Sequence, residues 1–249
     1  MRQTGQMRIL AVDTAEQSSS IAVVEDGVPI CEIFSLDRMT HSKTVMDMVV
    51  YALEERAKIT IKEVDGFVVA SGPGSFTGLR IGISIIKGLA FATSKPSAGV
   101  SSLDGVGYQF SFSSYPVCVM MDAKRGEIYC AIYNFSNGRL LKKSKEAVVS
   151  PDDALSLAIS KNISSINSDL PNSHYLFVGS GAVAFQQLIQ DCMGNKALFA
   201  PYFQNSVKAS ALADVVFQDS TLLSLSPDAI KPIYLRRSDA EINYGFKKI

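Results

Sequence analysis

Residues 8–35 read RILAVDTAEQSSSIAVVEDGVPICEIFS, and this stretch decides the fold. Arg8–Asp13 is a short apolar run typical of a buried strand, and Ser20–Glu25 repeats the pattern. Asp26-Gly27 is a strong hairpin signal, after which Val28–Phe34 returns as a third strand. The chain is therefore expected to begin with three consecutive strands, two of them joined by a tight turn.

Helices and a further strand follow this opening. Periodicity predicts a helix over Ser42–Lys58, a short apolar strand over Asp65–Ser71, and a glycine-rich turn, Gly72–Gly78, that opens a helix ending near Thr93. The second half repeats the order. Its expected strands are Val117–Asp122, Glu127–Phe135, Arg139–Val149 and Tyr175–Val178, and its expected helices are one starting at Pro151, Ala182–Cys192 and Val207–Leu223.

A βββαβα unit that occurs twice predicts an α/β protein of two lobes. This plan resembles the actin-like ATPase (ribonuclease H-like) fold, in which two lobes flank a nucleotide cleft. Residues 1–7 are expected to be a frayed start, 8–105 the N-terminal lobe, and 106–249 the C-terminal lobe with a tail. The border is expected within Ser101–Pro116, which is rich in serine and glycine.

Composition limits the classes of function. Lys plus Arg and Asp plus Glu number 24 each, so the formal net charge of the 249 residues is zero. A neutral chain has no global basic field for an RNA backbone, and another subunit would supply most of that charge. No uninterrupted apolar run reaches the roughly 18 residues needed to span a bilayer, no signal peptide is recognised, and a cytoplasmic protein is expected.

Cysteine and histidine spacing does not indicate a metal site. The cysteines form no CxxC pair, and reduced thiols are the simpler interpretation. His41 and His174 each lack another histidine or a cysteine nearby in sequence. His41 is expected to cap or flank the helix that begins there.

Residues 71–80 read SGPGSFTGLR, and two interpretations remain open. The glycines could let backbone N–H groups converge on an anion, with Thr77 capping the next helix. They could instead allow close packing in a tight strand-to-helix turn. The segment is not a Walker A loop, because Leu79-Arg80 replaces the Lys-Ser/Thr pair that binds phosphate and magnesium.

Both predicted N-terminal helices carry more apolar residues than one sheet face needs. In a soluble protein, such a surplus marks either a binding face or a helix enclosed within its own domain. Two polar segments are also open to two interpretations. Asp13-Thr14 could lie near phosphates or cap the turn that follows. The segment Asp122–Tyr129, DAKRGEIY, could be a salt-bridged hairpin or a contact surface for a partner or RNA through Lys124 and Arg125.

Six segments together resemble the TsaB family, also called YeaZ. They are ILAVDTAEQSSSIAVV (residues 9–24), THSKTVMDMV (40–49), GPGSFTGLRIGISIIKGLA (72–90), GVSSLDGV (99–106), MDAKRGEIYCAIYN (121–134) and PIYLRRSDAE (232–241). The resemblance implies a bacterial subunit that binds its paralogue TsaD. TsaD transfers a threonylcarbamoyl group to the adenosine that follows the tRNA anticodon, and TsaE, an ATPase, joins the complex. TsaC makes the threonylcarbamoyl adenylate.

The resemblance also implies that this chain lacks the catalytic apparatus of TsaD. TsaD-type sequences carry an HxxxH metal motif where this chain has Ser102 and Val106, and valine has no lone pair for a metal. They also carry ETSCDD where residues 13–18 here read DTAEQS. Gln17 and Ser18 replace the adjacent acids, although a shifted alignment would place Glu16 there.

The expected function is a non-catalytic scaffold that heterodimerises with TsaD, contacts tRNA indirectly, and forms a homodimer when alone. No metal or cofactor is expected, apart from a possible nucleotide at the partner interface. The contact residues expected from the family are Met46, Val49, Val50, Leu53, Leu79, Arg80, Ile83 and Lys87. A vestigial nucleotide site would use Asp13, Thr14, Gly179, Ser180 and Gly181. The alternatives are an independent actin-fold ATPase or kinase and, on weaker grounds, an M22-type glycoprotease, for which HExxH and HxxxH are missing.

Overall fold

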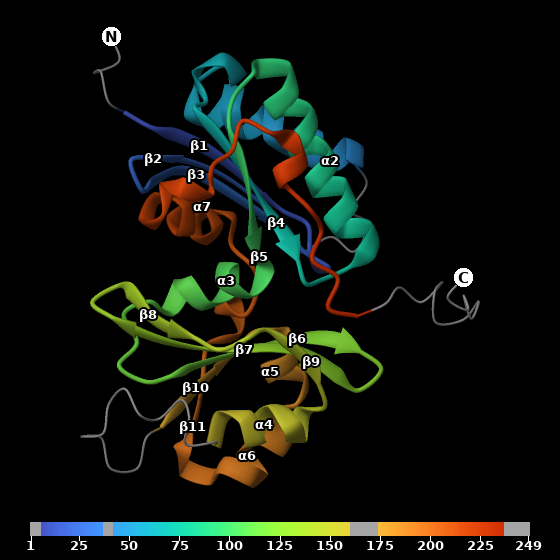
Figure 1. The fold of residues 1–249 in the computed structure, drawn as a ribbon, viewed down its shortest axis with the longest axis vertical. Coiled ribbons are helices and arrows are strands. Elements are labelled where there is room, and N and C mark those ends of the chain that lie inside the picture. Colours follow the sequence, from blue (N-terminus) through green and yellow to red (C-terminus); the bar gives the residue numbers. More distant parts are fainter. Residues whose placement is uncertain (1–5, 37–41, 160–173, 237–249) are drawn as a thin grey trace.

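The computed structural model describes residues 6–36, 42–159 and 174–236, which form two lobes, each built on a mixed sheet (Figure 1). The first sheet contains β1 (Arg8–Asp13), β2 (Ser19–Glu25), β3 (Val28–Ser35), β4 (Gly66–Gly72) and β5 (Ser97–Ser101). Its order is β3-β2-β1-β4-β5. The β1–β2 and β2–β3 pairs are antiparallel, whereas β4 runs parallel to both β1 and β5.

The second sheet repeats the same plan. It contains β6 (Val117–Lys124), β7 (Glu127–Ser136), β8 (Arg139–Lys143), β9 (Ala147–Val149), β10 (Tyr175–Val178) and β11 (Ala197–Phe199). The order is β11-β10-β6-β7-β8, with β9 also paired to β7. Reversed, the second order is β8-β7-β6-β10-β11, in which each strand corresponds to the strand at the same place in β3-β2-β1-β4-β5. The matching orders confirm the predicted duplication.

The α-helices differ from expectation in three places: none was predicted over residues 102–107, one is interrupted at residue 185, and the last ends at residue 218 and not at 223. They are α1 (Ser42–Val50), which continues as a π-helix over Tyr51–Ala57, α2 (Phe76–Thr93), α3 (Ser102–Gly107), α4 (Pro151–Ile159), α5 (Ser180–Ala184), α6 (Gln186–Met193) and α7 (Ala209–Gln218). The helix expected over Ala182–Cys192 is interrupted at Phe185, whose φ of −112° is not helical. The strand expected over Arg139–Val149 is split at Ser144, whose N–H and Oγ both bond the backbone of Ile132.

Two helices tie the lobes together. The helix α3, directly after β5, packs against β6 and β7 of the second sheet. The helix α7 packs against β1, β2 and β4 of the first sheet (Figure 1). Within Ser101–Pro116, where the border was expected, Ser102–Gly107 is helical and mostly buried, and α7 covers the N-terminal sheet although it lies late in the sequence.

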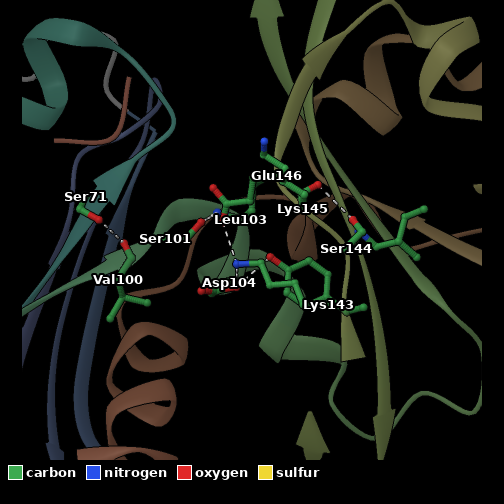
Figure 2. A network of polar contacts seen from close by, with 11 residues as sticks. Ser71, Val100, Ser101, Leu103, Asp104, Lys143, Ser144, Lys145 and Glu146 are labelled. Atoms are coloured by element: carbon green, nitrogen blue, oxygen red, sulfur yellow. Dashed lines mark hydrogen bonds and ion pairs between the residues drawn. The ribbon is translucent and has the colours of Figure 1, made fainter. Parts of the chain in front are cut away.

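A partly buried polar network joins α3 to the second sheet (Figure 2). Asp104 accepts a hydrogen bond from the Tyr133 hydroxyl at 2.8 Å and from Lys143 Nζ at 2.6 Å. Lys143 Nζ also donates to Glu146 at 2.7 Å. The bend after β8 brings Glu146 to Lys143, and Lys143 in turn binds Asp104, so the interruption of the expected strand contributes to the junction between the lobes.

Candidate functional site

A cleft of about 800 Å³ lies between the lobes. Most of its walls come from four parts of the chain that are distant in sequence. They are the loop between β1 and β2 (residues 15–18), the start of α2 (74–78), the hairpin between β6 and β7 (121–125), and the tail (233–236), together with Ser180. The carboxyl ends of β1 and β6 both point toward this cleft, which is where ligands of open α/β sheets bind.

Asp13 and Thr14 lie behind the cleft wall and are fully buried. Asp13 Oδ1 accepts a hydrogen bond from the Ala15 N–H at 3.0 Å, and Oδ2 is buried with no hydrogen-bond partner among the described residues. Burial raises the pKa of Asp13 to about 8. Thr14 Oγ1 donates to the Gly78 carbonyl at 2.7 Å. Of the two interpretations of Asp13, the structure shows the turn cap.

The glycine-rich segment is used for close packing. A Cβ atom on Gly74 would lie 2.4 Å from the Ala15 carbonyl oxygen, and one on Gly78 would lie 2.0 Å from that of Thr14. The Ser75 N–H also donates to the Ala15 carbonyl at 2.7 Å. Ser75, not Thr77, caps α2, because its Oγ accepts from the Gly78 N–H. The start of α2 is therefore pressed onto the β1–β2 loop, as the packing interpretation requires.

Glu16 and Ser180 meet across the cleft. Ser180 Oγ donates to the Glu16 carboxylate and accepts from the Asp122 N–H at 3.0 Å. Burial raises the pKa of Glu16, the Ser180 hydrogen bond opposes that rise, and Asp122 adds to it. The carboxylate from one lobe is thus held by the other lobe. Sequence reasoning identified Glu16 only as a residue that a shifted alignment would place at the position of the TsaD-type acids.

The predicted loop Gly179–Gly181 is divided between two tasks. Ser180 lines the cleft, whereas the Gly179 N–H donates to Asn205 Oδ1 at 2.7 Å. Gly179 has a φ of 100°, and a Cβ atom there would lie 2.4 Å from the Met120 carbonyl oxygen. Gly181 is packed against the same carbonyl. The five residues predicted for a nucleotide site are therefore not gathered around one opening.

The hairpin between β6 and β7 has the expected salt bridges. Lys124 Nζ lies 2.6 Å from Asp122 Oδ2. Lys124 and Arg125 have φ values of 63° and 57°, in the left-handed region that L-residues rarely adopt. Arg236 from the tail binds this turn, as described below. The salt-bridged interpretation is confirmed, and contact of Lys124 and Arg125 with a partner or RNA stays a prediction.

The structure divides the eight residues expected to contact a partner. Val49, Leu53, Leu79 and Ile83 are buried in the chain's own core, with at most 6% of each residue exposed. Helical periodicity identified them as apolar, but they face the first sheet. Their side chains are therefore not available to a partner in this conformation, which corrects that part of the expected contact surface.

Other side chains of these helices do reach the surface. Val50 is 45% exposed and Met46 is half-buried. Arg80 bonds Tyr234, and Lys87 lies 4.0 Å from Asp228, so both are engaged by the tail. Residues that sequence reasoning did not select also contribute, because Tyr51 is 49% and Phe91 is 79% exposed. We give the name helix-pair face to half-buried Met46 together with the exposed residues Val50, Tyr51, Ser84, Gly88 and Phe91.

The positions aligned with a metal motif are enclosed. Ser102 and Val106 lie in α3 and are fully buried. Within the described ranges, no group of three His, Cys, Asp or Glu side chains could hold a metal ion. The His174 ring lies 5.5 Å from that of Tyr115, and His41 lies outside the described residues.

Helix α2 bears on the expectation that no segment spans a bilayer. Its 18 residues are long and apolar enough, by length and composition, to cross a membrane. Leu79, Ile83, Ile86 and Ala90 on this helix are buried, and the helix packs on β4. A core helix meets the same criteria of length and composition.

Two lobes of matching strand order around a cleft define a protein of the actin-like ATPase fold. The crystal structure of YeaZ from Pseudomonas aeruginosa has this fold, with a TM-score of 0.72, 23% identity, and coverage of 92% of this chain and 100% of that one. A family model described as "TsaD: tRNA N6-adenosine threonylcarbamoyltransferase" matches residues 36–244.

Curated relatives place the chain more narrowly. The protein from Bacillus subtilis named "tRNA threonylcarbamoyladenosine biosynthesis protein TsaB" is 30% identical over 238 residues, covering 96% of this chain and 98% of its own length. The Escherichia coli protein of the same name is 36% identical over 149 residues, covering 59% and 64%. The chain belongs to the TsaB family.

Proposed function

We propose that this chain is a non-catalytic subunit in the biosynthesis of threonylcarbamoyladenosine in tRNA, and that it acts by heterodimerising with TsaD. The names of its relatives support the pathway. The similarity of the chain to a TsaD-type family model supports a common origin with the transferase. Two related chains of one fold are suited to pairing through equivalent faces.

The observation that supports a non-catalytic role is that the acidic side chains and glycines at the cleft make contacts within the chain itself. Asp13 is fully buried behind the cleft wall and caps the Ala15 N–H, and burial raises the pKa of its carboxyl group to about 8, which disfavours the charged form that a metal would need. Glu16 is bonded to Ser180, and the glycines of both loops pack against neighbouring backbone. In this chain, the acidic side chains and glycines that could take part in catalysis make structural contacts instead.

The helix-pair face is the surface that we assign to TsaD. A stable interface buries roughly 800 Å² on each partner, and its centre usually contains aromatic residues and methionine. Tyr51, Phe91 and Met46 supply those residue types. A Cβ atom on Gly88 would meet nothing within 4 Å, so a partner helix can approach this helix closely.

The remaining partners follow from this arrangement. TsaE would join the heterodimer, and tRNA would be held mainly by the other subunits because this chain has zero formal net charge. In the absence of TsaD, the helix-pair face would pair with a second copy and give a homodimer. We place the protein in the cytoplasm, where tRNA is modified.

One alternative, an independent ATPase or kinase, rests on the size of the cleft and on Ser180 in its wall. Calorimetry of the isolated chain with ATP and magnesium discriminates between the two. Micromolar binding with turnover favours the enzyme, whereas no heat of binding and no turnover favour the scaffold.

The interface assignment predicts that Val50→Asp weakens binding to TsaD at least about tenfold, because a carboxylate would have to be desolvated at the contact. Isothermal titration calorimetry with purified TsaD measures this change. Leu53→Asp and Ile83→Asp are unsuitable tests, because both would place a charge in the chain's own core.

Val183→Asp is the matched control, since Val183 is 36% exposed and lies on α5 of the other lobe. It should bind TsaD like the unmodified chain. Equal affinity of the Val50→Asp variant and the unmodified chain would contradict the assigned face.

A further inference from the structure

The segment Ile230–Arg236 leaves the N-terminal lobe and ends on the C-terminal lobe. Ile230 is buried in the first core, against Gly99. The Ile233 N–H donates to the Ser71 carbonyl, at the end of β4, at 2.7 Å. The Ile233 carbonyl oxygen comes so close to Gly72 that a Cβ atom on Gly72 would lie only 2.5 Å from it. This end of the segment is therefore part of the first lobe.

An aromatic and cationic cluster fixes the middle of the segment to the start of α2. The Tyr234 ring stacks on Phe76, with 5.2 Å between centroids. Arg80 Nε donates to the Tyr234 hydroxyl at 3.2 Å, and its guanidinium lies 3.8 Å from the centre of the Phe76 ring. Stacking, a hydrogen bond and a cation–π contact thus combine at one point of the cleft wall.

The far end of the segment binds the second lobe. Arg236 Nη1 donates to the Ala123 carbonyl at 2.7 Å and lies 3.4 Å from Glu127 Oε2. The Arg236 side chain is only 14% exposed. These contacts lie on either side of the left-handed Lys124-Arg125 turn. A guanidinium that binds a carbonyl and a carboxylate together has one favourable orientation, so it holds the turn in a defined place.

A second connection crosses the same cleft from different elements. Glu16, in the β1–β2 loop, accepts from Ser180 at the start of α5. Arg236 and Glu16 both come from segments anchored in the first lobe, and both end on the second lobe beside β6.

We propose that Ile230–Arg236 is an inter-lobe strap, which together with the Glu16–Ser180 contact fixes the opening of the cleft through the chain's own residues. Proteins of two lobes ordinarily close around a ligand by hinge motion. In this chain, residues of the chain itself make the contacts that hold the two lobes together, so the cleft keeps one opening before anything binds. The inference does not depend on the proposed pairing with TsaD.

Pulsed electron–electron double resonance, which measures the distance between two spin labels, tests the strap on the full chain. Spin labels would be placed at Lys62→Cys on the first lobe and Asn195→Cys on the second, both exposed, with Cys31 and Cys192 replaced by serine. The parent chain should give one narrow distance distribution. Arg236→Ala should shift that distribution to longer distances and broaden it, and adding Ser180→Ala should increase both effects.

Asp228→Asn is the matched control, because its contact with Lys87 lies within the first lobe. It should leave the distribution unchanged. If Arg236→Ala does not fold, as judged by circular dichroism, Glu127→Gln removes the ion pair from the other side and should cause a smaller shift in the same direction. An unchanged distribution in the strap variants, a broad distribution in the parent, or equal broadening in Asp228→Asn would overturn the proposal.

Discussion

Asp104→Ala is expected to lower the free energy of unfolding by about 2–3 kcal/mol, because it removes two hydrogen bonds to a charged and partly buried carboxylate. The substitution removes the acceptor of the Tyr133 hydroxyl and one of the two carboxylates that bind Lys143, which keeps only Glu146. The side chains of Lys143 and Asp104 are only 23% and 16% exposed, so water can compensate little of the loss. Urea-induced unfolding, followed by circular dichroism, measures the change.

Glu55→Ala is the comparison for this experiment. Glu55 pairs with Lys58 at 3.4 Å, but the two side chains are 64% and 70% exposed. An exposed pair of this kind contributes about 0–0.5 kcal/mol. A loss below about 1 kcal/mol for Asp104→Ala, on the same scale as Glu55→Ala, would show that the network in Figure 2 does not hold the lobes together.

Gly78→Ala is expected to destabilise the protein by about 3 kcal/mol, at the upper end of the usual cost of overpacking. The added methyl group would lie 2.0 Å from the Thr14 carbonyl oxygen, which is backbone and cannot rotate away. Relief requires that α2 move off the β1–β2 loop, which breaks the bond from Thr14 Oγ1 to the Gly78 carbonyl. Thermal and urea unfolding both report the loss.

Gly88→Ala, on the same helix, should act in the opposite direction. A Cβ atom there meets nothing within 4 Å, so the change only removes the helix penalty of glycine, about 0.5–1 kcal/mol. Gly78→Ala with unfolding parameters equal to those of Gly88→Ala would contradict the close packing of the glycine-rich segment.

The first four strands of the first lobe, β1 to β4, could be predicted to within a residue or two. In β1 and β2 nearly every residue is buried, so the apolar run matches the strand, and Asp26-Gly27 marks the turn. The strands β5 and β11 were not predicted. Ser97–Ser101 reads SAGVS, and Ala197–Phe199 has three residues, so neither has a recognisable period. Both exist because β4 and β10 offer a free parallel edge.

The candidate site was less predictable, because it depends on contacts between distant segments. The pattern of α2 shows that it is apolar but not which arc faces β4, and Leu79 and Ile83 were therefore assigned to the wrong surface. Tyr234 bonds Arg80, which is 154 residues away in sequence, and Arg236 bonds Ala123, which is 113 residues away. No local pattern encodes such pairs.

Threonylcarbamoylation of tRNA in a reconstituted mixture tests the central claim most directly. The mixture contains TsaC, TsaD, TsaE, tRNA, threonine, bicarbonate and ATP, and modified adenosine is measured by mass spectrometry with and without this chain. We predict product when the chain is present, background alone when it is omitted, and background alone when it replaces TsaD. Equal product without the chain, or product from the chain in the absence of TsaD, would contradict a non-catalytic subunit that works through TsaD.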